Sequence, residues 1–235
     1  MRIVSDLHTH TRHSHGTGSI EDNVRAAIDK GLRAIAISDH GFDHIFYSIR
    51  DVDRYLQEIG DIKAKYAGKI DVLSNVELNL LSLDGKVDIP EGYEDSFDLK
   101  MFGYHKMVRC SDFKSARQFL LPKRHSVKSV ALNTAAYIAA IEKNKIDIIT
   151  HPGYGLPIDK IAVAKAAKEH GTALEINAKH PEFTVDELIA CAQTGVTFVI
   201  GSDAHSPDRV GDFAAALERA QQAGLQASQI INAEE

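Results

Sequence analysis

The chain has 235 residues, a formal net charge of −6, 12 histidines and 44% hydrophobic residues. This composition excludes a disordered chain and argues against a generally nucleic-acid-binding surface, and the length suffices for a full core. The two cysteines, Cys110 and Cys191, are too few and too far apart for a disulfide framework, which fits a reducing cytoplasm. Because no signal peptide stands at the start and no apolar run approaches about 18 residues, we expect a cytoplasmic protein without a membrane span.

Apolar runs with strand character alternate with segments of helical periodicity. The expected strands are residues 3–4, 32–38, 71–80, 98–104, 147–150, 172–177 and 196–200. The expected helices are residues 20–30, 52–66, 131–143, 159–170, 184–194 and about 206–223, of which the first and fifth begin with capping boxes at Ser19 and Thr184. Residues 81–96 carry turn signals, and residues 106–130 show neither period.

The order helix, glycine, strand recurs at Gly31, Gly171 and Gly195 and predicts βαβ units with parallel strands. About seven such units suit either an open doubly wound sheet or a barrel. No Gly-x-Gly-x-x-Gly loop follows a strand, which weighs against a dinucleotide-binding open sheet. Metal-ligand residue types end nearly every strand, as in barrels whose active site lies at the C-terminal face. We therefore predict one α/β barrel domain over residues 1–235.

Histidines and carboxylates gather at these strand ends. In Ser5–Thr11, alternation places His8 and His10 on the same side, where neutral imidazoles form a pair of metal ligands. With the other strand ends the candidates are His8, His10, His40, Glu77, His105, His151, Asp203, His205 and one histidine of the first loop, His13 or His15. These are too many for one ion, and without a thiolate they suit zinc, manganese or iron.

In this order the motifs resemble the PHP (polymerase and histidinol phosphatase) superfamily, from Asp6 to His205. They are His-x-His, Ser-Asp-His, a mid-chain Glu, Gly-Tyr-His, Thr-His-Pro-Gly and Gly-Ser-Asp-Ala-His, and the likeness is closest to the stand-alone bacterial phosphatases. The resemblance implies a distorted (β/α)7 barrel with three divalent ions at the C-terminal face of the strands. The first ion would be held by His8, His10, Glu77 and Asp203, the second by Glu77, His105 and His151, and the third by His15, His40 and His205.

Residues around this set receive subordinate roles. The family pattern favours the loop histidine that precedes a small residue, His15. His44 and His180, in predicted loops near the site face, are placed to touch a substrate. The polar residues expected to orient the imidazoles are Asp6, Asp39 and Asn177, with capping of a local turn as the alternative role of Asp6.

The expected reaction is hydrolysis of small phosphomonoesters by direct attack of a metal-bound hydroxide, with Glu77, Asp203 and His205 as catalytic residues. The absence of a P-loop and of a Gly-x-Ser-x-Gly motif disfavours a kinase or a serine hydrolase. Two alternatives stay open. One is a related metallohydrolase acting on histidinol phosphate, on nucleotides or on DNA 3′ ends, and the other is a non-catalytic metal-stabilised binding module. The expected partner is a small phosphorylated substrate, nucleic acid is less favoured, and the oligomeric state stays open.

Residues 106–130 contain seven basic residues and one acidic residue. The segment follows His105 and therefore begins at the mouth of the predicted site, where long loops are often functional. We predict a basic lid that recruits phosphate. Its candidate phosphate contacts are Arg109, Arg117, Lys123 and Arg124.

Overall fold

The computed structural model describes residues 1–120 and 126–235. Its centre is a seven-stranded sheet in which every neighbouring pair is parallel and the strand order follows the chain. The strands are β2 (Ser5–Asp6), β3 (Ala34–Ile37), β4 (Asp71–Asn79), β5 (Leu99–Gly103), β6 (Ile148–Ile149), β7 (Ala173–Asn177) and β8 (Phe198–Gly201).

The two edges of this sheet nearly meet. Beyond β2 and β8, Thr9 and Ala204 form a parallel bridge, and the His10 N–H donates to the Ala204 carbonyl at 2.8 Å. The sheet is thus almost closed into a barrel, which confirms the predicted distorted (β/α)7 fold.

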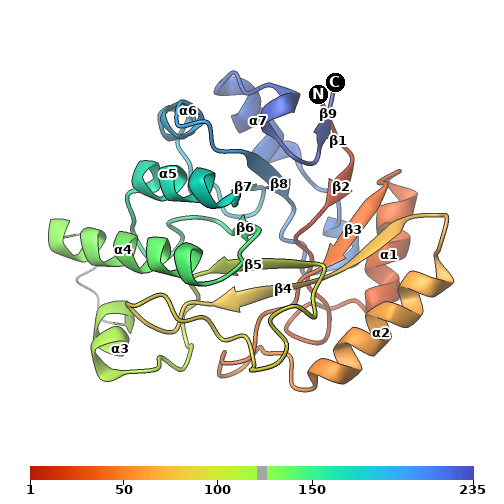
Figure 1. The fold of residues 1–235 in the computed structure, drawn as a ribbon. Helices are drawn as coiled ribbons and strands as arrows, with labels where there is room; N and C mark the ends of the chain where they lie inside the picture. Colours follow the sequence, from red (N-terminus) through yellow and green to blue (C-terminus); the bar gives the residue numbers. More distant parts are fainter. Residues whose placement is uncertain (121–125) are drawn as a thin grey trace.

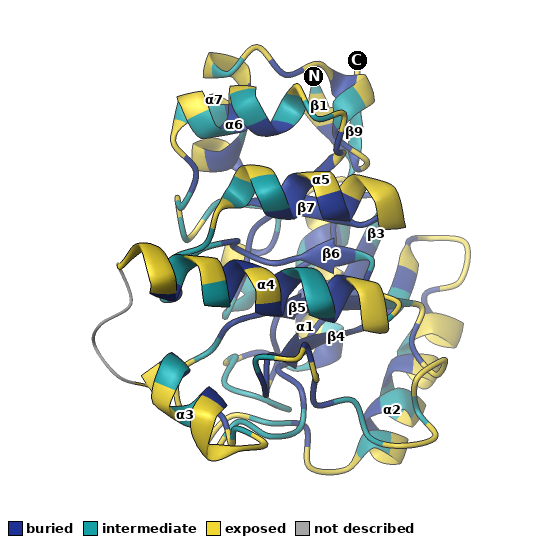
Figure 2. Cartoon of the chain, turned by 60° about the vertical axis from the view of Figure 1, so that its left-hand side comes forward, coloured by how far each residue is buried: buried dark blue, intermediate teal, exposed yellow. Residues whose placement is uncertain are grey.

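Helices cover the sheet on its outside (Figure 1). They are α1 (Ile20–Asp29), α2 (Val52–Lys65), α3 (Phe113–Leu120), α4 (Val127–Lys143), α5 (Lys160–His170), α6 (Val185–Ala192) and α7 (Ala214–Gln222). Their buried faces turn toward the sheet and their exposed faces outward (Figure 2). The predicted capping boxes at Ser19 and Thr184 are both present. No helix separates β4 from β5, so one unit of the barrel has a loop instead.

Two parts of the sequence prediction are corrected. Residues 106–130 are not wholly irregular, because α3 lies within them and α4 begins at Val127 rather than at Ala131. After α7, where the sequence analysis predicts no element, β9 (Ala233–Glu234) pairs antiparallel with β1 (Arg2–Ile3) and brings the two termini together (Figure 1).

The side chains on one face of the strands change from apolar to polar or small toward the C-terminal ends of the strands. A small apolar cluster, separate from the main core, takes one residue from or beside six strands: Leu7, Ala36, Met101, Ile148, Ala173 and Val199. Because side chains alternate along a strand, the next residue on the same face after Ala173 is Glu175, and after Val199 it is Gly201. Toward the C-terminal ends of the strands this face therefore becomes polar or small, which makes room for a site.

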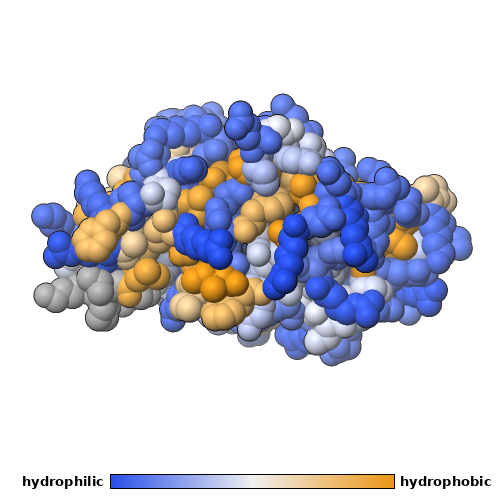
Figure 3. All heavy atoms as spheres, turned by 90° about the horizontal axis from the view of Figure 1, so that it is seen from below, coloured by the Kyte–Doolittle hydropathy of each residue, from blue (hydrophilic) through white to orange (hydrophobic). Residues whose placement is uncertain are grey.

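In the described part of the chain, no helix is long and apolar enough to cross a membrane. On the face seen from below, a group of hydrophobic residues lies among mostly hydrophilic ones (Figure 3).

Candidate metal centre

Glu77, on β4, is fully buried and surrounded by imidazole nitrogens. Its Oε1 lies 3.0, 3.2 and 3.5 Å from Nε2 of His151, His105 and His8. Its Oε2 lies 2.9 Å from Nδ1 of His40 and 3.6 Å from Nε2 of His10. These histidines follow four different strands, so it is the barrel that brings them around one carboxylate.

Asp203, just after β8, is the second carboxylate of the cluster. Its Oδ1 lies 3.3 Å from both Nε2 of His10 and Nδ1 of His205. Asp203 has a φ of 51° and His151 a φ of 26°, and among the described non-glycine residues only Met107 joins them at positive φ. Such backbone costs on the order of 1–3 kcal/mol and is typical of functional sites.

The structure brings all nine predicted ligand residues together. His15 completes the set, because its ring centroid lies 4.1 Å from that of His205 and 4.8 Å from that of His40. His13, the other candidate of the first loop, points elsewhere, with Nε2 3.1 Å from Oε2 of Glu58. We therefore propose His15, and not His13, as the loop ligand.

The closest groupings of ligand atoms differ in part from the expected division among three ions. His8, His10 and Asp203 form one group, as expected. The other two groups both contain His40, once with His10 and His205 and once with Glu77 and His105. The division among ions given in the sequence analysis is therefore kept here only as a proposal.

The donor atoms fit divalent cations. Both oxygens of Glu77 and one nitrogen each of His10, His15, His40, His105 and His151 are buried without a hydrogen-bond partner among the described residues. Buried polar atoms are nearly always paired, so several unpaired acceptors and imidazoles in one place are typical of residues that bind a cation. Oxygen and imidazole donors without thiolate suit zinc, manganese or iron.

The ionisation of two histidines of the cluster suits metal binding, whereas, against the effect of burial, nearby carboxylates raise the pKa of His8 and of His151. Burial, together with the charges of neighbouring imidazoles, lowers the pKa of His15 to about 3, and burial is the main cause that lowers the pKa of His40 to about 4. Both rings are therefore neutral at pH 7, the form that binds metals. Burial opposes ionisation of Glu77 and Asp203, but the surrounding histidines hold the pKa of both carboxyls well below its ordinary value.

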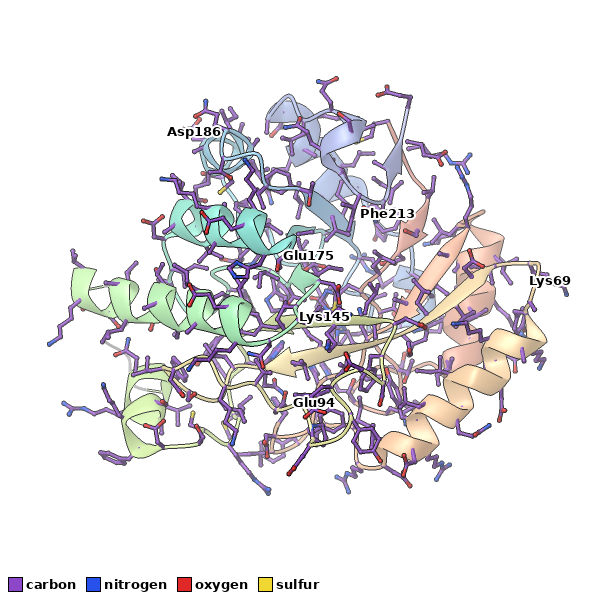
Figure 4. All side chains as sticks on the ribbon, viewed as in Figure 1. Lys69, Glu94, Lys145, Glu175, Asp186 and Phe213 are labelled. Atoms are coloured by element: carbon purple, nitrogen blue, oxygen red, sulfur yellow. The ribbon has the colours of Figure 1, made fainter. Side chains whose placement is uncertain are left out.

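Glu175, on β7, is the important residue that the sequence analysis missed. Its Oε1 lies 2.7 Å from Nδ1 of His8, and its Oε2 accepts from the His151 N–H at 2.8 Å and from Nδ2 of Asn177 at 2.9 Å. A carboxylate on the far nitrogen of a ligating histidine fixes the tautomer and orientation of the ring. Figure 4 shows Glu175 in the interior, whereas Asp186 and Lys69 lie at the periphery. The available signal was an acidic residue within the apolar run of residues 173–176.

Asn79, at the end of β4, plays the same part for His105. Its Oδ1 lies 2.8 Å from Nδ1 of His105. Asp88 in turn holds Asn79, accepting from its backbone N–H at 2.7 Å and from its Nδ2 at 2.6 Å. Neither residue was singled out from the sequence.

The three polar residues expected to orient imidazoles act differently. Asp39 accepts from Thr11 and Ser14 and so fixes the first loop. Asp6 accepts from Ser202 and Gly211 and joins the two ends of the sheet. Asn177 donates to the carboxylates of Glu175 and Asp203. That part of the prediction is wrong, because none of these three side chains forms a described hydrogen bond to an imidazole ring.

A cavity of about 520 Å³ opens above the cluster. The two predicted substrate-touching histidines, His44 and His180, both line it, as do the lysines Lys106 and Lys179. Nζ of Lys179 lies 2.9 Å from Nδ1 of His205 and 3.5 Å from Oδ1 of Asp203.

The predicted phosphate contacts of the lid are not supported by this cavity. Arg109 and Arg117 are absent from its lining. Lys123 and Arg124 lie outside the described residues. Among the described residues of the predicted lid, only Lys106 and Met107 line the cavity.

Seven histidines and two carboxylates gather at the C-terminal ends of the strands of a parallel barrel. This combination is typical of barrels that bind metal ions. The PHP domain profile matches residues 6–228, and the chain belongs to the PHP family. A probable phosphatase of Aeromonas hydrophila is 31% identical over 242 residues, which cover 98% of this chain and 90% of the relative. A probable phosphatase of Thermoanaerobacter sp. is 32% identical, covering 99% of this chain and 91% of the relative.

Solved structures show the same fold. A histidinol phosphate phosphatase from Lactococcus lactis, complexed with zinc, L-histidinol and phosphate, superposes with a TM-score of 0.67 at 18% identity and covers 94% of each chain. A putative histidinol phosphatase from Listeria monocytogenes gives a TM-score of 0.56 at 18% identity, covering 88% of this chain and 97% of the other. At this identity the likeness concerns the fold alone.

Proposed function

We propose that the protein is a metal-dependent hydrolase of phosphate esters, acting on small phosphomonoesters. The observation that carries this proposal is the carboxylate of Glu77, enclosed by five histidines below a cavity that also holds two lysines. The naming of its relatives as probable phosphatases supports the same reaction. The substrate class and the mechanism are our own inference.

The cluster is proposed to hold three divalent ions, most simply zinc, with manganese or iron as alternatives. The zinc in the Lactococcus lactis structure supports this choice. Divalent ions in such a cluster lower the pKa of a bound water and neutralise the charge of a phosphate ester. Glu77 is proposed to bridge two ions, because both of its oxygens are approached by imidazoles from different strands.

The remaining residues hold the substrate and the ligands in place. Lys179 and Lys106 line the cavity and would attract and orient the phosphate dianion. Glu175 holds His8 and the backbone of His151, so the positions of two ligands do not depend on the substrate. Asp203 and His205, which lie against each other within the cluster, are proposed to have catalytic roles.

The two alternative readings are less well supported. A purely structural metal site needs about four ligands, whereas nine candidate residues converge here on an open cavity. Histidinol phosphate is one member of the monoester class, and a panel of substrates separates monoesters from diesters and nucleic-acid ends. The single-domain organisation and the cytoplasmic location also remain proposals.

A panel of substrates tests the function. Metal-loaded protein should release phosphate from phosphomonoesters, with chelation abolishing the activity, and should be slow on phosphodiesters and on single-stranded DNA. Asp203→Asn and His10→Ala should each lower kcat/KM by several powers of ten, whereas Asp186→Asn, on the exposed face of α6, should not. Cleavage of diesters or DNA ends alone would replace this proposal with the related hydrolase. No hydrolysis at full metal occupancy would favour a binding module.

A further inference from the structure

The cavity above Glu77 is larger than a phosphate group requires, and part of its lining is apolar. Its volume of about 520 Å³ is typical of pockets that enclose a small organic molecule. Four large side chains around it remain partly in water, with exposed fractions of 59% for Phe46, 43% for Tyr47, 46% for Met107 and 38% for Tyr154. Large apolar side chains left exposed around one cavity indicate a ligand-binding surface.

We infer that these residues bind the organic group of the substrate, so that the enzyme prefers phosphate esters of ring-bearing alcohols to those of small aliphatic alcohols. The inference rests on the proposed phosphatase function and adds the class of substrate. Two walls of the cavity carry it, each built from residues that are distant in the sequence.

The first wall is fixed by backbone pairing between two loops. The Ile45 N–H donates to the Met107 carbonyl at 2.9 Å, and the Arg109 N–H donates to the Asp43 carbonyl at 3.0 Å. This pairing brings Met107, which follows β5, beside Phe46 and Tyr47, which follow β3.

A side chain stiffens the same wall from within. Nδ1 of His44 accepts from the N–H of Phe46 at 3.2 Å and from the N–H of Tyr47 at 3.0 Å. Asp88 accepts from the N–H groups of Phe42 and Asp43. Because the wall is held before any ligand arrives, little conformational entropy is lost when a ring packs against it.

The second wall is an aromatic stack on the loops after β6 and β7. The rings of Tyr154 and His180 lie 3.9 Å apart between centroids, at 28° to one another. Oδ1 of Asn177 accepts from the His180 N–H at 2.7 Å and fixes this turn. The Tyr154 ring also meets the ring of His151 at a centroid distance of 5.4 Å, so the stack begins directly beside the cluster. A planar group esterified to a phosphate at the cluster would find flat, apolar surfaces within reach.

Benzyl phosphate and ethyl phosphate form a suitable pair of substrates. Both are esters of primary alcohols with similar leaving-group chemistry, so the ratio of their kcat/KM values reports mainly how the ring is bound. We expect benzyl phosphate to be favoured by on the order of 10-fold or more. Phe46→Ala and Tyr154→Ala should each bring this ratio closer to one. Phe113→Ala, a control that removes a side chain 84% exposed on α3 and away from the cavity, should leave it unchanged.

Binding of non-hydrolysable analogues separates the two proposals. Calorimetry should give a lower Kd for benzylphosphonate than for ethylphosphonate, and the difference should shrink in Phe46→Ala. Equal Kd values and equal kcat/KM values would overturn the inference and leave the phosphatase function standing, as would a ring preference that survives in both cavity variants. If neither ester is hydrolysed, the phosphatase function fails, and the phosphonate affinities alone then decide whether the cavity selects rings.

Discussion

Oε1 of Glu175 lies 2.7 Å from Nδ1 of His8, although 167 residues separate them in the sequence. The other oxygen of the same carboxylate accepts from the backbone N–H of His151 at 2.8 Å. One buried side chain therefore orients one proposed ligand and places the backbone of another. The Nε2 atom of His8 remains directed toward Nε2 of His10, at 3.1 Å, and Oε1 of Glu77, at 3.5 Å.

Glu175→Gln should weaken metal binding without unfolding the protein. The amide keeps the size of the side chain but removes the charge that favours an Nδ1–H donor on His8. We expect the affinity for divalent ions to fall about 10- to 100-fold, measured by competition with a chelating dye. Glu169→Gln, the same change on the exposed face of α5, is the control and should have no effect. Unchanged affinity in Glu175→Gln would show that this contact does not tune the cluster.

Gly201→Ala should damage the site through sterics. A Cβ at this position would overlap Oε1 of Glu175 and come within 3.1 Å of Cβ of His8. We expect a loss of about 1–3 kcal/mol in the free energy of unfolding, measured with urea, together with lower metal occupancy.

Gly60→Ala is the matched glycine control, and it should raise the free energy of unfolding rather than lower it. Gly60 is exposed within α2, and a Cβ there would meet no atom within 4 Å. Because alanine favours the helix, the free energy of unfolding should rise by about 0.5–1 kcal/mol. If Gly201→Ala behaved like Gly60→Ala, the tight packing around Glu175 would be refuted.

Lys179→Ala should lower kcat/KM for a phosphomonoester more than substitutions in the predicted lid do. Lys179 lines the cavity, whereas Arg117 does not, so we expect kcat/KM to fall about 10- to 100-fold in Lys179→Ala and to change little in Arg117→Ala. Steady-state kinetics with a phosphomonoester measure both, and Lys165→Ala on exposed α5 controls for loss of positive charge. A larger loss in Arg117→Ala would restore the lid prediction.

The parts of the site that could be predicted are those where a metal-ligand residue type stands at the C-terminal end of a predicted strand. Parallel strands place their C-terminal ends together, so His40, Glu77, His105 and Asp203 were expected to meet. The choice of His15 over His13 came only from the family resemblance. In the structure the position of His15 beside His40 and His205 follows from the fold of the first loop, which Thr11 and Ser14 anchor to Asp39.

The misses have a common cause, which is that contacts between distant strands leave little trace in a local pattern. The local sequence predicts no role for Glu175 beyond its strand, because its partner His8 lies at the other end of the chain. The pairing of β1 with β9 involves only two residues on each side and has no periodicity to detect. Helix α3 has eight residues, so its apolar stripe is too short to stand out from a basic segment.

Glu21 should make stability depend on acid pH. Hydrogen bonds from Lys65 and then Tyr66 lower the pKa of Glu21 to about 2 from an ordinary value of 4.5. A carboxyl whose pKa is lower in the folded state stabilises the fold above the unfolded pKa, and this contribution is lost as pH falls from 4.5 toward 2. Urea unfolding should therefore show Glu21→Gln to be less stable than the parent at pH 6, with a gap that narrows below pH 4.5. A difference in the free energy of unfolding that did not depend on pH would contradict this link between α1 and α2. The control Glu169→Gln should be as stable as the parent at every pH.

The number of divalent ions per chain, measured together with phosphate release from the same sample, tests the account most directly. Protein purified without chelators should carry two to three ions per chain by elemental analysis. The same sample should hydrolyse a phosphomonoester. Chelation should remove its ions and abolish its activity, and adding zinc back should restore the ions and the activity. A folded sample that hydrolyses the ester with one ion or none per chain would contradict the proposed cluster around Glu77.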